Sequence, residues 1–175
     1  MREVQAQADH VTPHVRGFVR ALKACGHEVM VVSSSQTGDL GPGIGLQRIS
    51  PAPFASEVPL DSGPRVVRAL NHIWNNVHAG EVLESLYCSF KPDLVYERLS
   101  PFAVAGSALS QRHHIPHYLE VNALLAREGN TYRKQSLGEA AELLESCVFQ
   151  FATRLITVSE ALRVELLNAG IPGNR

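Results

Sequence analysis

Short apolar runs alternate with helix-spaced apolar patterns along the whole chain. The runs predict buried strands at residues 28–32, 93–97, 117–121 and 154–158, and a weaker strand at 46–49. Apolar residues that recur every three or four positions predict helices at residues 13–25, 62–90, 101–112, 136–152 and 160–169. Because strands and helices alternate, we expect an α/β domain with three layers around a mostly parallel, doubly wound (Rossmann-like) sheet.

Capping signals agree with several of these helix starts. Proline follows a capping residue at Thr12-Pro13 and again at Ser100-Pro101, a pair that marks the first turn of a helix. Ser136 and Glu139 have the spacing of a capping box, and Ser159 is a further N-cap candidate.

The longest predicted helix, residues 62–90, has a well-defined apolar face. This face consists of Val66, Val67, Leu70, Ile73, Trp74 and Val77. Gly80 marks a point where the helix could break in two.

Both ends of the chain differ from a complete domain of this kind. Residues 2–9 contain only Val4, Ala6 and Ala8 as apolar residues, so we expect the first strand to be weak or absent. Residues 170–175 resemble a linker that is cut short. We therefore expect one domain over residues 1–175, either a fragment or a half that works with another chain.

Composition and charge narrow the function classes. The chain is 45% hydrophobic and 19% charged, with a formal net charge of -1, which argues against a nucleic-acid binder held by bulk electrostatics. Cys25, Cys88 and Cys147 are widely spaced within or beside predicted helices, which favours buried thiols in a reducing compartment. Without an apolar leader or a membrane-length apolar run, we expect a cytoplasmic protein, and peripheral contact with a membrane stays open.

Polar residues gather where two predicted strands end. The carboxyl ends of parallel strands meet at one edge of a sheet, and ligands bind beyond that edge. Glu97 and Arg98 close one strand, and they either form a local ion pair or contact a ligand. Glu120 and Asn122 close another. A carboxylate inside a strand must be paired, so Glu120 either accepts bonds from loop backbone or a neighbouring arginine, or binds substrate hydroxyls.

Three further polar residues are candidates for the same site. Glu128 and Arg133 lie in the polar loop predicted before residue 136, and they are either solvated or suited to a polyol or a phosphate-bearing partner. His14 lies at the start of the first helix, where it is either a structural residue or a contact for an anion.

The sequence favours neither a metal nor a dinucleotide cofactor. His113, His114 and His117 cluster, but a proline interrupts them and a fourth donor is lacking. The glycines at 41–45 do not lie between a predicted strand and a helix, which the nicotinamide fingerprint requires.

In their order along the chain, these motifs resemble the N-terminal domain of a family 4 (group 1) glycosyltransferase with the GT-B fold. The matching residues are His14-Val15, Arg20–Leu22, Gly26–Val29, Lys91–Arg98, Leu119–Asn122 with Glu128, Arg154–Leu162 and Gly170–Pro172. The ordered set extends over nearly the whole chain.

The resemblance implies one half of a GT-B fold, the half that mainly binds the acceptor. A C-terminal domain of such an enzyme binds the nucleotide-sugar donor, and the transfer retains the anomeric configuration, usually without a metal. The implied partners are a glycan, lipid or small-molecule acceptor, together with the missing donor-binding domain or a second chain. The nucleotide sugar is a substrate, so no cofactor is expected.

The resemblance also implies roles for the polar residues named above. The expected set is His14 as the catalytic residue, with Glu97, Arg98, Glu120, Asn122, Glu128 and Arg133 binding substrate. His14 would orient the acceptor or a phosphate, Glu120 and Asn122 would bind acceptor hydroxyls, and Arg98 and Arg133 would hold an anionic group.

One departure from the family pattern keeps an alternative open. The family places a glycine pair between the first strand and the first helix, where this chain has Val11-Thr12-Pro13. The alternative is a non-catalytic binding or partner module derived from such a domain.

Overall fold

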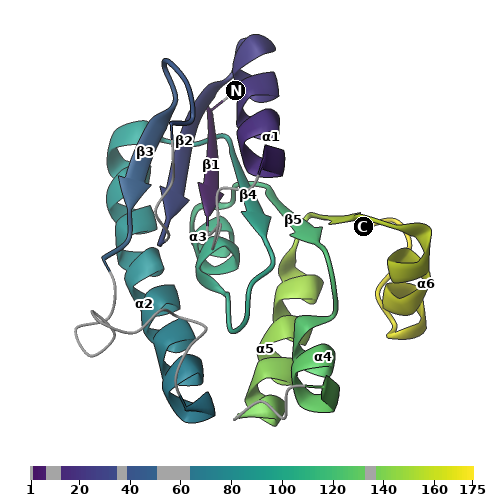
Figure 1. The fold of residues 1–175 in the computed structure, drawn as a ribbon. Helices are drawn as coiled ribbons and strands as arrows, with labels where there is room; N and C mark the ends of the chain where they lie inside the picture. The colour runs from purple at the N-terminus through teal and green to yellow at the C-terminus, as the bar shows by residue number, and fades with distance from the viewer. Residues whose placement is uncertain (1, 7–12, 35–38, 51–63, 133–136) are drawn as a thin grey trace.

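The sheet of the molecule has six strands, all parallel, in the order β3-β2-β1-β4-β5-β6 (Figure 1). The computed structural model describes residues 2–6, 13–34, 39–50, 64–132 and 137–175. The strands are β1 (Arg2–Ala6), β2 (Glu28–Ser33), β3 (Gly45–Arg48), β4 (Leu94–Arg98), β5 (His117–Val121) and β6 (Arg154–Thr157). Because all pairings are parallel, the carboxyl ends of the strands lie at one edge of the sheet.

Helices cover both faces of this sheet. They are α1 (Pro13–Ala24), α2 (Arg65–Phe90), α3 (Ala105–His113), α4 (Leu125–Tyr132), α5 (Gly138–Phe151) and α6 (Glu160–Asn168). On one face, Val29 and Val31 of β2 pack with α1. On the other face, Val32 and Val95 pack with α2 and α3. The three-layer, Rossmann-like class predicted from the sequence is confirmed.

The first strand is present and central, although the sequence predicted it to be weak or absent. β1 pairs with β2 along five residues and with β4 along four. Hydrogen-bonded ladders on both sides hold a strand in place without a long apolar run of its own. Local hydrophobicity therefore underestimated this strand.

The apolar face predicted for α2 does not pack as a core face. Val66, Leu70, Trp74 and Val77 are exposed. α2 runs without a break through Gly80, and its amino-terminal half extends past the carboxyl ends of β2 and β3 (Figure 1). The sheet offers no surface there for an apolar face to cover.

Two helix starts differ from the prediction, because side chains from other elements hold them. α3 begins at Ala105, not at Ser100-Pro101, and Asn76 of α2 accepts hydrogen bonds from the backbone N–H groups of Val104 and Ala105, at 2.8 and 3.0 Å. α4 occupies part of the stretch predicted as loop. A capping group that arrives from elsewhere in the fold leaves no local sequence signal.

Other termini match their signals. Ser159 Oγ accepts a hydrogen bond from Leu162 N, which confirms the cap of α6. The capping roles of Thr12 and Ser136 lie outside the described residues.

The three cysteines are free thiols, but they are not core residues as predicted. Cys25 and Cys88 are exposed and Cys147 is half-buried. Within the described parts of the chain, no helix combines the length and apolar content that a membrane span requires.

Candidate functional site

Strand alternation distributes the polar residues of β4 and β5 over the two faces of the sheet. Successive side chains of a strand point to opposite faces. Tyr96, Arg98 and Glu120 therefore lie on the face that α1 covers, whereas Glu97 and His117 lie on the face that α3 covers. This separation decides which predicted site residues meet.

Glu120 is the centre of a polar cluster at the carboxyl edge of the sheet. The Tyr96 hydroxyl donates to Glu120 Oε2 over 2.7 Å, and His14 Nε2 lies 3.1 Å from the same oxygen. Phe18 of α1 packs on the Tyr96 ring with 4.4 Å between ring centroids, which fixes the phenol beneath the helix. The carboxylate side chain is only 4% exposed.

Arg98 and Asn122 occupy the other carboxylate oxygen. The amide of Asn122 satisfies both neighbours when its nitrogen donates to Glu120 Oε1 over 3.0 Å and its oxygen accepts from Arg98 Nη2 over 3.2 Å. Arg98 Nε also lies 3.7 Å from Glu120 Oε1. We call His14, Tyr96, Arg98, Glu120 and Asn122 the Glu120 cluster.

The electrostatics of the cluster keep Glu120 ionised. Burial alone would raise its pKa, but the hydrogen bonds from Tyr96 and His14 and the charge of Arg98 hold the pKa below the usual range of a glutamate. Burial, together with the hydrogen bond to Glu120, raises the pKa of Tyr96, so its hydroxyl stays a donor. The cluster is a buried anion surrounded by donors.

The cluster presents donors, not its carboxylate, to solvent. His14 is 57% exposed and Arg98 is 30% exposed, whereas both oxygens of Glu120 are occupied. Because Glu120 is an ionised acceptor, His14 Nε2 carries a proton, which makes Nδ1 of the neutral ring an acceptor. The exposed groups can thus contact hydroxyls and anionic groups, while Glu120 fixes their positions.

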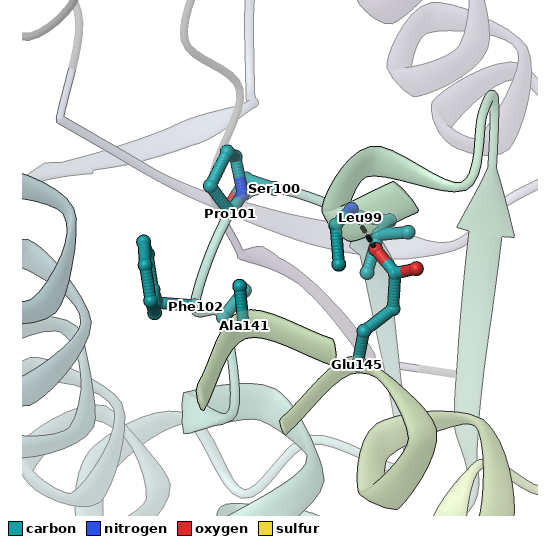
Figure 2. A pocket seen from close by; sticks show the side chains of 8 residues that line it. Leu99, Ser100, Pro101, Phe102, Ala141 and Glu145 are labelled. Carbon is teal, nitrogen blue, oxygen red and sulfur yellow. Dashed lines mark hydrogen bonds between the residues drawn. The ribbon is translucent and has the colours of Figure 1, made fainter. Parts of the chain in front are cut away.

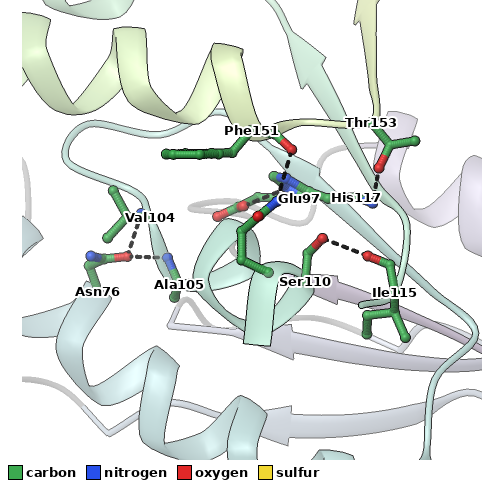
Figure 3. A network of polar contacts seen from close by, with 10 residues as sticks. Asn76, Glu97, Val104, Ala105, Ser110, Ile115, His117, Phe151 and Thr153 are labelled. Carbon is green, nitrogen blue, oxygen red and sulfur yellow. Dashed lines mark hydrogen bonds and ion pairs between the residues drawn. The ribbon is translucent and has the colours of Figure 1, made fainter. Parts of the chain in front are cut away.

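Glu97 lies outside this cluster, although the sequence placed it in the same site. Its carboxylate is fully buried and lies 2.9 Å from His117 Nε2, also fully buried (Figure 3). Gly106 of α3 leaves room for this carboxylate, because a Cβ at position 106 would overlap Glu97 Oε2. The pair joins β4, β5 and α3, which is a contact within the fold.

Glu128 and Arg133 complete the list of predicted site residues. Glu128 is exposed on α4, where its charge acts on Glu145 of α5 and not on Glu120. Arg133 lies outside the described residues.

Glu145 was not predicted, and it holds α4 in position behind Asn122. Its carboxylate accepts hydrogen bonds from the first N–H groups of α4, those of Leu125 and Ala126, the latter over 3.0 Å (Figure 2). It borders a cavity of about 10 Å³, enough for about one water molecule. Burial, with the charges of Glu142 and Glu128 and against those backbone donors, raises its pKa to about 7.

Tyr96 is the cluster member that sequence reasoning missed. It is two residues before Arg98 in the same strand, and this spacing places both side chains on one face. The signal was therefore present in the strand period. Among the described residues, no three His, Cys, Asp or Glu side chains converge closely enough to bind a metal ion.

A family model described as "glycosyl transferase 4-like domain" matches residues 11–175. No curated protein sequence matches the chain. The match therefore extends over the cluster and both faces of the sheet.

Several solved structures share this fold at low sequence identity. Sucrose-phosphate synthase from Thermosynechococcus elongatus aligns with a TM-score of 0.68 and 12% identity over 98% of this chain and 45% of that one. Phytolacca americana UGT2, in complex with UDP-2fluoro-glucose and pterostilbene, gives 0.65 and 11% over 99% and 52%. UDP-GlcNAc 2-epimerase from Methanocaldococcus jannaschii gives 0.56 and 14% over 99% and 44%. The chain thus spans about half the length of each.

Proposed function

The chain belongs to the glycosyl transferase 4-like domain family, and we propose that it is the acceptor-side half of a retaining glycosyltransferase. Such an enzyme moves a sugar from a nucleotide-sugar donor to a glycan, lipid or small-molecule acceptor. The observation that carries the proposal is the Glu120 cluster, which places His14, Arg98 and Asn122 together beyond the strand ends.

In this proposal, Glu120 is a positioning residue. Its ionised carboxylate holds the imidazole of His14 and the guanidinium of Arg98 on either side of one anchor. His14 orients an acceptor hydroxyl or a phosphate, and Asn122 contacts acceptor hydroxyls. Arg98 binds an anionic group, because a guanidinium retains further donors after its bonds to Asn122.

The nucleotide sugar would be held by a second domain or a second chain. The similar solved structures are about twice as long as this chain. One of them, Phytolacca americana UGT2, carries UDP-2fluoro-glucose and pterostilbene in the same complex. A cytoplasmic location is part of the proposal, supported by three thiols that form no disulfide.

The test combines this chain with a donor-binding half, as one polypeptide or as two chains. Transfer of labelled sugar from a panel of nucleotide sugars to glycan, lipid and small-molecule acceptors is measured. Glu120→Gln removes the charge that positions His14 and Arg98, so we expect kcat/KM to fall by about tenfold or more. His14→Gln should lower it as well.

Glu84→Gln is the matched control. Glu84 also contacts one arginine and one histidine, Arg112 at 2.6 Å and His113 at 2.8 Å, but it lies on α2 and not at the strand ends. The control should retain the kinetics of the unaltered chain. Equal losses for Glu84→Gln and Glu120→Gln would remove the Glu120 cluster from the proposal.

The alternative is a non-catalytic partner module. The sequence between β1 and α1 favours it, because residues 7–12 contain no glycine to let backbone approach a donor phosphate. The alternative is supported if the two halves form a stable complex that transfers sugar to none of the acceptors.

A further inference from the structure

An apolar stripe runs along the exposed side of α2. Val66, Leu70, Trp74 and Val77 are 50%, 46%, 40% and 58% exposed. Their spacing of four, four and three residues places them on one side of a helix. We call these four residues the α2 stripe.

The same half of α2 turns polar residues inward. Asn71, Asn75 and Asn76 are buried, and Asn76 binds the start of α3. A helix that only covers a core has the opposite arrangement, with apolar residues inside and polar residues outside. The α2 stripe is therefore apolar surface that this domain does not use for its own packing.

Charge around the stripe has one sign. Residues 65–80 contain Arg65, Arg68, His72 and His78 but no aspartate or glutamate, and the first acid of the helix is Glu81. Apolar and aromatic residues combined with basic residues are typical of helices that lie in the boundary between lipid headgroups and acyl chains. Anionic lipids attract such basic residues.

The position of the stripe suits a flat partner. The amino-terminal half of α2 projects beyond the carboxyl ends of β2 and β3, and it forms one side of the molecule there (Figure 1). A bilayer could reach the stripe without displacing another helix, because its four side chains are already exposed.

We propose that the α2 stripe docks on an anionic lipid surface, with Trp74 inserted at the headgroup level and Arg65 beside the lipid phosphates. This inference is independent of sugar transfer. A protein surface or a second copy of this chain would need complementary acidic groups around an apolar centre, whereas an anionic bilayer supplies both over any area.

The test uses the unaltered chain and vesicles of phosphatidylcholine, with or without phosphatidylglycerol. Trp74 is the single tryptophan, so its emission reports on the stripe alone. We expect a blue shift and co-sedimentation with the anionic vesicles and much weaker binding to phosphatidylcholine alone. Leu70→Ser should weaken binding about tenfold, since a buried leucine side chain is lost. Arg65→Gln should weaken it about fivefold.

Leu143→Ser is the matched control, because Leu143 is 66% exposed on α5. It should bind vesicles like the unaltered chain. If Leu70→Ser fails to fold by circular dichroism, Val77→Ser serves in its place. The proposal is overturned if anionic vesicles leave the emission unchanged, or if the control weakens binding equally. It is also overturned if the emission shifts with protein concentration alone and the chain dimerises through the stripe.

Discussion

At the scale of single residues, two glutamates at neighbouring positions in the fold have opposite ionisation behaviour. Glu120 is surrounded by a phenol, an imidazole, an amide and a guanidinium, and its pKa is lowered. Glu145 has two backbone donors but also two acidic neighbours, and burial raises its pKa to about 7. The number and charge of the neighbouring groups, more than burial itself, decide which carboxylate stays charged.

Glu145 should make the stability of the domain depend on pH. Between its ordinary pKa of 4.5 and about 7, the folded chain holds a proton that the unfolded chain has released, so stability falls as pH rises through that window. Glu145→Gln keeps an acceptor for Ala126 N without the charge. At pH 8 this variant should be more stable by about 1–2 kcal/mol, a value reduced because part of the group is solvated.

Urea unfolding at pH 5 and pH 8 measures this difference. The two proteins should have nearly equal stability at pH 5, where Glu145 is protonated in the folded chain. An equal gain from Glu145→Gln at both pH values would show that the charge of Glu145 is not its cause.

At the scale of elements, the sequence predicts what local periodicity controls. The apolar runs at 94–98 and 117–121 became β4 and β5 within one residue of their predicted bounds. The starts of α3 and α4 could not be predicted, because Asn76 and Glu145 supply their capping acceptors from other helices. The strand period could have separated Glu97 from Arg98, since adjacent residues of one strand face opposite sides.

The approach of α3 to β4 should depend on Gly106. A Cβ at this position would overlap Glu97 Oε2 and press on Val95 at 3.3 Å, so Gly106→Ala must displace the buried Glu97–His117 pair. We expect a loss of about 1–3 kcal/mol in the free energy of unfolding. Urea denaturation at constant pH measures it.

Gly80→Ala is the control for this substitution. Gly80 lies inside α2, and a Cβ there would meet nothing within 4 Å. Alanine favours a helix interior over glycine, so this variant should gain about 0.5–1 kcal/mol. The same sign of change at both positions would contradict the role given to Gly106.

At the scale of the whole molecule, one end of the sheet is unfinished. β6 lies at the edge of the described sheet and pairs only with β5. Ile156 and Val158 are exposed there, as are Val164 and Leu167 of the adjoining α6. Figure 1 shows α6 projecting beside this edge, away from α5. An edge strand with exposed apolar neighbours is a surface for association, and a donor-binding half is the partner that the proposed function places there.

Without a partner for this surface, the chain should self-associate through it. We expect the average mass in sedimentation velocity to rise with protein concentration. Val158→Lys combined with Val164→Lys places charges in the surface and should weaken the association about tenfold, because each lysine must lose water on contact. Leu143→Lys, at an exposed position of α5, should leave the association unchanged. A chain that stays monomeric at all concentrations, or a control that weakens association equally, would mean that the edge at β6 does not attract a partner.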